Sequence, residues 1–139
     1  MSSFVLDASI ALGWILDRPV PTQASRAQKS LLSGTRALVP ALWHLEIANA
    51  LAVAERRGVL SAADAALALL NVERLAAQVL DTETELVSMR QAWTTARGHQ
   101  LSAYDSVYLE LARRRNVPLA TLDLALRNAA VRAGVALLH

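Results

Sequence analysis

The feature that most limits the possible folds is a regular alternation of short apolar runs with longer stretches of helical periodicity. The runs Phe4-Val5-Leu6 and Ala37-Leu38-Val39 contain only apolar side chains, which is typical of strands buried on both faces of a sheet. The stretches between such runs are amphipathic, and several of them stop at a glycine or a proline. This pattern predicts an α/β fold, a three-layer sandwich with a mainly parallel central sheet flanked by helices.

The expected elements extend over the whole chain. The expected strands cover residues 3–6, 37–39, 78–80, 118–122 and 135–138. The expected helices cover residues 8–16, 22–32, 41–57, 61–77, 84–97, 102–115 and 124–133. Because 139 residues can bury a substantial core and no linker or internal repeat divides them, we expect residues 1–139 to form one domain.

Composition excludes several classes of protein. Hydrophobic residues make up 54% of the chain, yet no apolar run approaches the ~18 residues that a membrane helix requires. The apolar N-terminus has no basic leader and contains Asp7, so it does not resemble a signal peptide. The lack of cysteine excludes disulfides, thiolate metal ligands and a cysteine nucleophile, and it fits a cytoplasmic protein.

Four carboxylates lie within or at the ends of the most apolar segments, where charges are least expected. They are Asp7, Glu46, Asp105 and Asp123. Burial of an unpaired carboxylate is costly, so several that converge usually indicate a bound cation, and oxygen ligands favour a divalent metal such as Mg²⁺. In open α/β sheets ligands bind at the carboxyl ends of strands, which is where Asp7 and Asp123 are expected.

Each acid also has a purely structural interpretation. Asp7 and Asp123 each stand between a strand and a helix and could simply be helix N-caps. Asp105 follows Ser102 at the spacing of a capping box. Glu46 lies more than one turn inside an apolar helix, so a cap does not explain it, although its side chain could point to solvent. The convergence of all four favours a shared site.

Three uncharged polar residues lie near these acids in the sequence: Ser9, Asn49 and Thr121. Asn49 follows Glu46 by three residues, which places both on one face of a helix. Thr121 precedes Asp123 by two residues, which places both on one face of a strand. We expect these side chains to support the site, with the hydroxyls orienting water or a carboxylate.

The four acids lie in four segments, which occur along the chain in the order FVLDAS (4–9), LEIANAL (45–51), YDSVYL (104–109) and LATLD (119–123). Together these segments resemble the PIN domain, and more narrowly the small ribonuclease toxins of bacterial VapBC toxin–antitoxin pairs. The resemblance implies a Mg²⁺- or Mn²⁺-dependent endoribonuclease in which the four carboxylates are the catalytic, metal-binding residues. It also implies a homodimer and a cognate antitoxin whose tail occupies a groove near the active site.

The sequence departs from some relatives directly after the fourth acid. Those relatives carry a further acid there, whereas Leu124, Ala125 and Leu126 follow Asp123 in this chain. We therefore expect Asp7, Glu46 and Asp105 to hold one metal ion and Asp123 to contribute to a second, weaker position. Such a site would activate water for attack on an RNA phosphodiester without a covalent intermediate.

The basic residues allow nucleic-acid binding but do not require it. The formal net charge is +2, and every basic residue except Lys29 is an arginine. The run formed by Arg113, Arg114 and Arg115 could contact an RNA backbone. The same run lies at the expected end of a helix, where cations also stabilise the helix dipole.

Three other functions are compatible with parts of this sequence. A phosphoacceptor receiver domain would carry paired acids after its first strand and a late lysine, whereas here Ala8 follows Asp7 and Lys29 is early. A non-catalytic PIN-like module that binds RNA or protein, and a PIN nuclease that acts without an antitoxin, both remain open alternatives.

Overall fold

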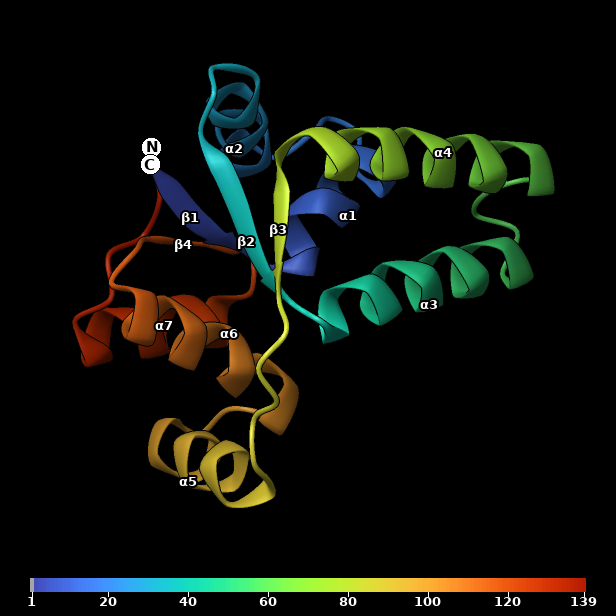
Figure 1. Ribbon diagram of the computed structural model, residues 1–139. Coiled ribbons are helices and arrows are strands. Elements are labelled where there is room, and N and C mark those ends of the chain that lie inside the picture. The colour runs from blue at the N-terminus through green and yellow to red at the C-terminus, as the bar shows by residue number, and fades with distance from the viewer. Residues whose placement is uncertain (1) are drawn as a thin grey trace.

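Four parallel strands form the central sheet of the protein, seen in a computed structural model that describes residues 2–139 (Figure 1). The strands are β1 (Ser3–Leu6), β2 (Arg36–Pro40), β3 (Leu80–Glu83) and β4 (Leu119–Ala120), in the order β3-β2-β1-β4. In the register of the sheet, Phe4 lies opposite Ala37, and Leu6 lies opposite Ala120. The predicted parallel sheet is thus confirmed.

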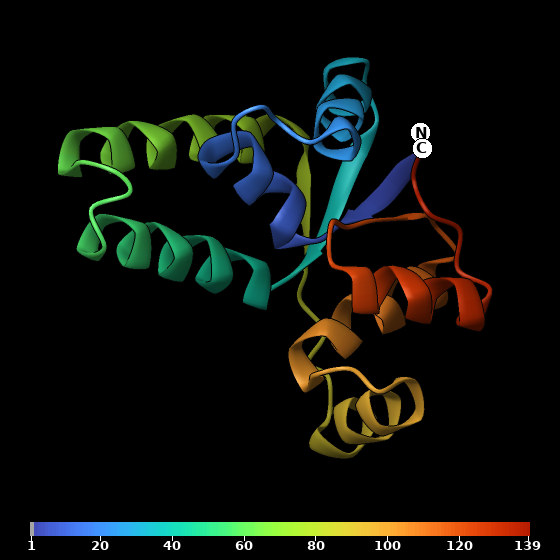
Figure 2. The ribbon, with the colours of Figure 1, turned by 180° about the vertical axis from the view of Figure 1, so that it is seen from behind.

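Helices cover both faces of this sheet. They are α1 (Ala8–Leu16), α2 (Thr22–Leu32), α3 (Leu42–Arg56), α4 (Ala62–Val79), α5 (Met89–His99), α6 (Ala103–Arg115) and α7 (Leu124–Ala133). Helix α6 packs against β1, β2 and β4 on the face nearer the viewer in Figure 1. Helices α1 and α2 pack on each other on the opposite face, which is turned forward in Figure 2. The predicted three-layer sandwich is confirmed.

Helices α3 and α4 lie side by side and project away from the sheet in both views (Figures 1 and 2). Each helix buries an apolar stripe, which includes Leu51 on α3 and Val72 on α4. Helix α4 is the longest helix in the part of the chain that is described, but no helix there has the length and apolar character needed to cross a membrane.

The central strand β1 is the most deeply buried element of the sheet. Phe4, Val5 and Leu6 are all at most 1% exposed, because helices cover both faces and strands flank both edges. Burial of an apolar side chain of this size contributes about 1.5–3 kcal/mol. Asp7 follows β1 directly, so its backbone lies in the interior of the protein.

Several expected elements differ from the structure in their bounds, and the strand expected at residues 118–122 is reduced to β4 at Leu119–Ala120. The strand expected at residues 78–80 is β3 at Leu80–Glu83, because helix α4 continues to Val79. The helix expected from residue 84 begins only at Met89, where the hydroxyl of Ser88 accepts a hydrogen bond from the backbone N–H of Gln91. At the C-terminus the strand expected at 135–138 is a single parallel bridge between Leu137 and Leu119.

Candidate active site

The carboxyl ends of β1 and β4 meet where the chain changes direction across the sheet. From β1 the chain adds β2 and β3 on one side, and it later returns to add β4 on the other side. Asp7 follows β1 and Asp123 comes shortly after β4, and the backbone N–H of Asp7 donates to the carbonyl of Ala120 at 3.0 Å. Both acids thus lie at a topological switch point, where open α/β sheets bind ligands.

Two hydroxyl groups hold the carboxylate of Asp7. Ser9 Oγ donates to Asp7 Oδ2 at 2.6 Å, and Thr121 Oγ1 donates to the same oxygen at 2.7 Å. Both hydroxyls also accept backbone hydrogen bonds, Ser9 from Leu122 at 2.9 Å and Thr121 from Asp123 at 3.0 Å. The structure therefore brings Ser9 and Thr121 together with Asp7, and the network ties the end of β1 to the end of β4.

Glu46 reaches the same region from α3. Its side chain is half-buried, and its Oε1 accepts a hydrogen bond from the phenol of Tyr108 on α6. Tyr108 is not among the residues predicted for the site. A signal was present, because Tyr108 follows Asp105 by three residues and so shares its face of a helix. The alternative that Glu46 points freely to solvent is wrong.

The three aspartates differ in whether they cap a helix. Asp123 Oδ1 accepts from the backbone N–H of Leu126 at 2.9 Å, so Asp123 is the N-cap of α7. Ser102 caps α6 by accepting from the backbone N–H of Asp105 at 3.0 Å, which leaves the carboxylate of Asp105 in the first turn. Asp7 stands at the N-cap position of α1 but makes no capping side-chain hydrogen bond. The capping interpretation therefore fails for Asp7.

Burial and mutual repulsion shift the protonation of three of these acids. Desolvation is the main cause that raises the pKa of Asp7, while the hydroxyls of Ser9 and Thr121 lower it and the charge of Asp123 raises it further. Desolvation also raises the pKa of Glu46, and the charges of Asp7 and Asp105 add to this effect, against the hydrogen bond from Tyr108. Desolvation, and then the charges of Asp123 and Asp7, raise the pKa of Asp105 to about 6.

These mutual effects show that the four carboxylates share one electrostatic environment, which a cation would stabilise. The available donors are carboxylate oxygens, the ligands that Mg²⁺ and Mn²⁺ prefer. Among residues 2–139, however, no three carboxylate or imidazole side chains are grouped tightly enough to hold an ion as they stand. Charge and donor type fit a divalent cation, whereas side chains would have to rotate to complete its coordination.

The remaining predicted site residues are less closely tied to this cluster. Asn49 is exposed and makes no side-chain hydrogen bond within the described residues. Arg114 and Arg115 both contact Glu83 Oε2, at 3.4 and 2.6 Å, and Arg113 lies 4.0 Å from Glu110. All three arginines also lie in the last turn of α6. Their expected role in RNA binding stays a prediction.

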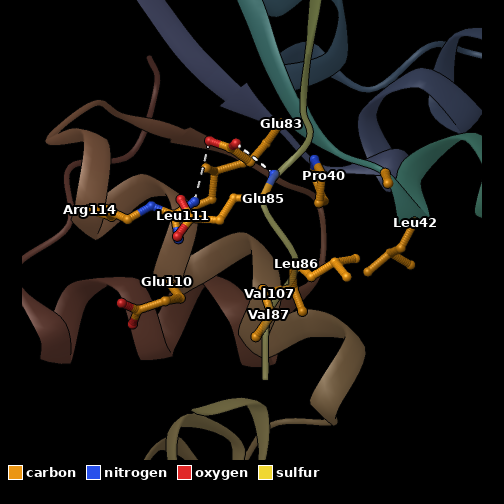
Figure 3. Close-up of a pocket in the computed structure, with 11 residues that line it drawn as sticks. Pro40, Leu42, Glu83, Glu85, Leu86, Val87, Val107, Glu110, Leu111 and Arg114 are labelled. Atoms are coloured by element: carbon orange, nitrogen blue, oxygen red, sulfur yellow. Dashed lines mark hydrogen bonds and ion pairs between the residues drawn. The ribbon is translucent and has the colours of Figure 1, made fainter. Parts of the chain in front are cut away.

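A separate apolar pocket of about 170 Å³ lies beside α6 and the segment that follows β3 (Figure 3). Leu42, Leu86 and Val107 contribute to its lining, and Glu83 pairs with Arg114 at its edge. None of the four carboxylates lines this pocket. The candidate active site is therefore defined by its charges and hydrogen bonds and not by this cavity.

Comparisons with known proteins agree with the resemblance to the PIN domain. The family model described as "PIN domain" matches residues 4–132. The chain is 35% identical over 122 residues to VapC ribonuclease Mb0985 of Mycobacterium bovis and to Ribonuclease VapC9 of Mycobacterium tuberculosis, matches that cover 88% of this chain and 87% of each relative.

A solved structure has the same fold. The crystal structure of PAE2754 from Pyrobaculum aerophilum superposes with a TM-score of 0.68 at 19% sequence identity, and the match covers 92% of this chain and 84% of that chain. Because the family model spans nearly the whole chain and the similarity to VapC proteins covers most of both sequences, the protein belongs to the PIN domain family and is VapC-like.

Proposed function

We propose that this chain is a divalent-metal-dependent endoribonuclease, the toxin of a type II toxin–antitoxin pair. The observation that carries the proposal is the convergence of Asp7, Glu46, Asp105 and Asp123, whose charges act on one another at the switch point of the sheet. Relatives that are 35% identical are named VapC ribonucleases, which supports RNA as the substrate. We propose that residues 1–139 act as one nuclease domain in the cytoplasm, where its RNA targets would be found.

In this proposal Asp7, Glu46 and Asp105 hold a Mg²⁺ or Mn²⁺ ion, and Asp123 contributes to a second, weaker position. A divalent ion bound there would make a water molecule more acidic and stabilise the charge that develops on the phosphate. Ser9 and Thr121 orient the carboxylate of Asp7 through hydrogen bonds at 2.6 and 2.7 Å. No side chain needs to form a covalent bond to RNA.

We propose that the partner is an antitoxin that binds beside α1. A groove of about 560 Å³ lies between α1 and α4, and its apolar lining includes Trp14, Ile15 and Leu75. The α1 residues in this groove lie in the last turn of the helix, and Asp7 lies at its other end, so a protein segment bound here would reach the acidic cluster only by continuing along α1. An antitoxin that binds the protein but leaves RNA cleavage intact would contradict this part of the proposal.

We further propose that the protein forms a homodimer. Leu86 and Met89 are 91% and 90% exposed, and Leu45 is 73% exposed, which is unusual for apolar side chains unless another surface covers them. Analytical ultracentrifugation of the purified chain tests this directly, and a monomer at all accessible concentrations would contradict it.

The decisive experiment is incubation of the purified protein with total cellular RNA, in Mg²⁺ or Mn²⁺ and in EDTA. We expect discrete RNA fragments that require the metal and disappear in Asp7→Asn, because this substitution removes a buried carboxylate of the cluster but retains its volume. Folding of the variant is verified by thermal melting. Absence of cleavage by folded wild type would instead support a PIN-like module that binds RNA or protein without cutting it.

A further inference from the structure

Tyr108 is a buried polar side chain that has no part in the function proposed above. It is 0% exposed and is the largest of the fully buried side chains in the described part of the protein. Its phenol donates a hydrogen bond to Glu46 Oε1, which joins α6 to α3 across a separation of 62 residues. A buried tyrosine needs a partner for its hydroxyl, and here that partner is one of the four acids.

Glu46 depends on this partner more than the other acids depend on theirs. Asp7 is anchored at the end of a strand, and Asp123 caps α7, whereas Glu46 extends from a helix that runs away from the sheet (Figure 1). Tyr108 is the only residue between 2 and 139 that makes a side-chain hydrogen bond to Glu46. Without it, a half-buried glutamate would occupy several rotamers, including some that turn toward water.

Helix α6 supplies both this hydroxyl and a carboxylate of the cluster. Asp105 lies in the first turn, and Tyr108 follows it by three residues on the same face. The ring of Tyr108 is immobilised by the core, where its neighbours Leu109 and Leu111 are at most 2% exposed. A rigid donor on the same helix as Asp105 thus determines where the carboxylate of Glu46 lies relative to that of Asp105.

We propose that Tyr108 is a positioning residue that holds Glu46 in the acidic cluster, so that Glu46 can bind a divalent cation together with Asp7 and Asp105. The inference rests on the proposed function, because it takes the cluster to be a cation site. Because Tyr108 is buried and its hydroxyl donates to Glu46, its expected effect on the site passes through Glu46.

The test is a titration with Mn²⁺, with free Mn²⁺ measured by electron paramagnetic resonance, on the full chain and on Tyr108→Phe. The substitution keeps the buried ring and removes only the hydroxyl. We expect Mn²⁺ binding to weaken by about tenfold or more, the usual effect of removing a hydrogen bond that orients a metal ligand. Equal affinity of the variant and the wild type would overturn the inference.

Tyr104→Phe is the matched control on the same helix. Tyr104 is 68% exposed and makes no side-chain hydrogen bond among the described residues, so its loss of a hydroxyl should leave Mn²⁺ affinity unchanged. Thermal melting in EDTA verifies that both variants fold. RNA cleavage assays should show a reduced kcat and a similar KM for Tyr108→Phe, because the buried hydroxyl does not contact the substrate.

A double-mutant cycle separates positioning from a general effect on the fold. If Tyr108 acts through Glu46, then adding Tyr108→Phe to Glu46→Ala should cause no further loss of Mn²⁺ affinity. The same loss in both backgrounds would show that the hydroxyl acts elsewhere and would overturn the inference.

The experiment also distinguishes this inference from the proposed function. A wild type that neither binds Mn²⁺ nor cleaves RNA would overturn the proposed function, and this inference with it. A wild type that binds Mn²⁺ and cleaves RNA, beside a Tyr108→Phe variant of equal affinity, would overturn only the role of Tyr108.

Discussion

Asp105 shows at the residue scale how the cluster depends on its surroundings. It is half-buried at the start of α6, and burial together with the charges of Asp123 and Asp7 raises its pKa from 3.8 to about 6. The folded protein therefore binds a proton at Asp105 more tightly than the unfolded chain does. Without a cation, ionisation of this residue at neutral pH opposes folding.

This shift predicts a pH-dependent difference between the wild type and Asp105→Asn in EDTA. As pH rises from about 4 to about 6, Asp105 loses its proton first in the unfolded chain, so the wild type loses stability through Asp105, and the variant lacks this contribution. The stability gained by the variant should grow across this range and then stay constant. Urea unfolding at several pH values measures it.

Asp64→Asn is the control for this measurement, because Asp64 occupies the corresponding first-turn position of α4, behind the N-cap Ser61. If the stability gained by Asp105→Asn does not depend on pH, the raised pKa of Asp105 is not the cause of the gain. If Asp64→Asn gains stability with the same pH dependence, proximity to the other acids is not the cause.

At the element scale, N-caps decide how helices present the acids. Ser102 caps α6 and Ser61 caps α4 with the same geometry, each accepting at 3.0 Å from the backbone N–H three residues later. Only α6 carries an acid of the cluster in the capped turn. The two caps therefore stabilise their helices in the same way, but only the cap of α6 also holds an acid of the proposed site in place.

We predict that Ser102→Ala and Ser61→Ala each lower the free energy of unfolding by about 1 kcal/mol, the usual effect of losing an N-cap. Only Ser102→Ala should also weaken RNA cleavage and Mn²⁺ binding, because fraying of the first turn of α6 displaces Asp105. Urea unfolding and the cleavage assay measure the two effects. Equal loss of cleavage in both variants would indicate that stability alone is responsible.

At the scale of the whole molecule, strands, α3 and α6 must come together before the four acids meet. The acids come from the end of β1, the second turn of α3, the first turn of α6 and the N-cap of α7. A cation bound among them would therefore bind the folded protein and not the unfolded chain. Any such ligand stabilises the fold by an amount that grows with the logarithm of its concentration relative to its dissociation constant.

We therefore predict that Mg²⁺ or Mn²⁺ raises the melting temperature of the protein. A ligand present at about 100 times its dissociation constant stabilises the folded state by about 2.7 kcal/mol. Asp7→Asn should melt normally in EDTA and lose most of the response to metal. Sodium chloride at equal ionic strength is the control, and an unchanged melting temperature with millimolar metal would contradict a shared cation site.

The sequence by itself determined the elements whose causes are local. Helices α1 and α2 begin and end where their sequences predict, and the cap Ser102 lies where its spacing from Asp105 predicts it. The buried strand β1 follows from a continuous apolar run. Since each of these features depends on interactions within a few residues, the chain alone was sufficient to place them and to put Asp7 at the end of a strand.

Only the tertiary structure decided the features that depend on distant partners. Strand β3 has no buried residue, because it lies at the edge of the sheet and depends on its hydrogen-bond ladder with β2, so no apolar run marked it. The hydrogen bond from Tyr108 to Glu46 and the contacts of Arg114 and Arg115 with Glu83 join helices and strands far apart in sequence. Such contacts form only once the sheet and its helices have assembled. Local spacing can place Tyr108 on the same helix face as Asp105, but it cannot identify Glu46 as the partner.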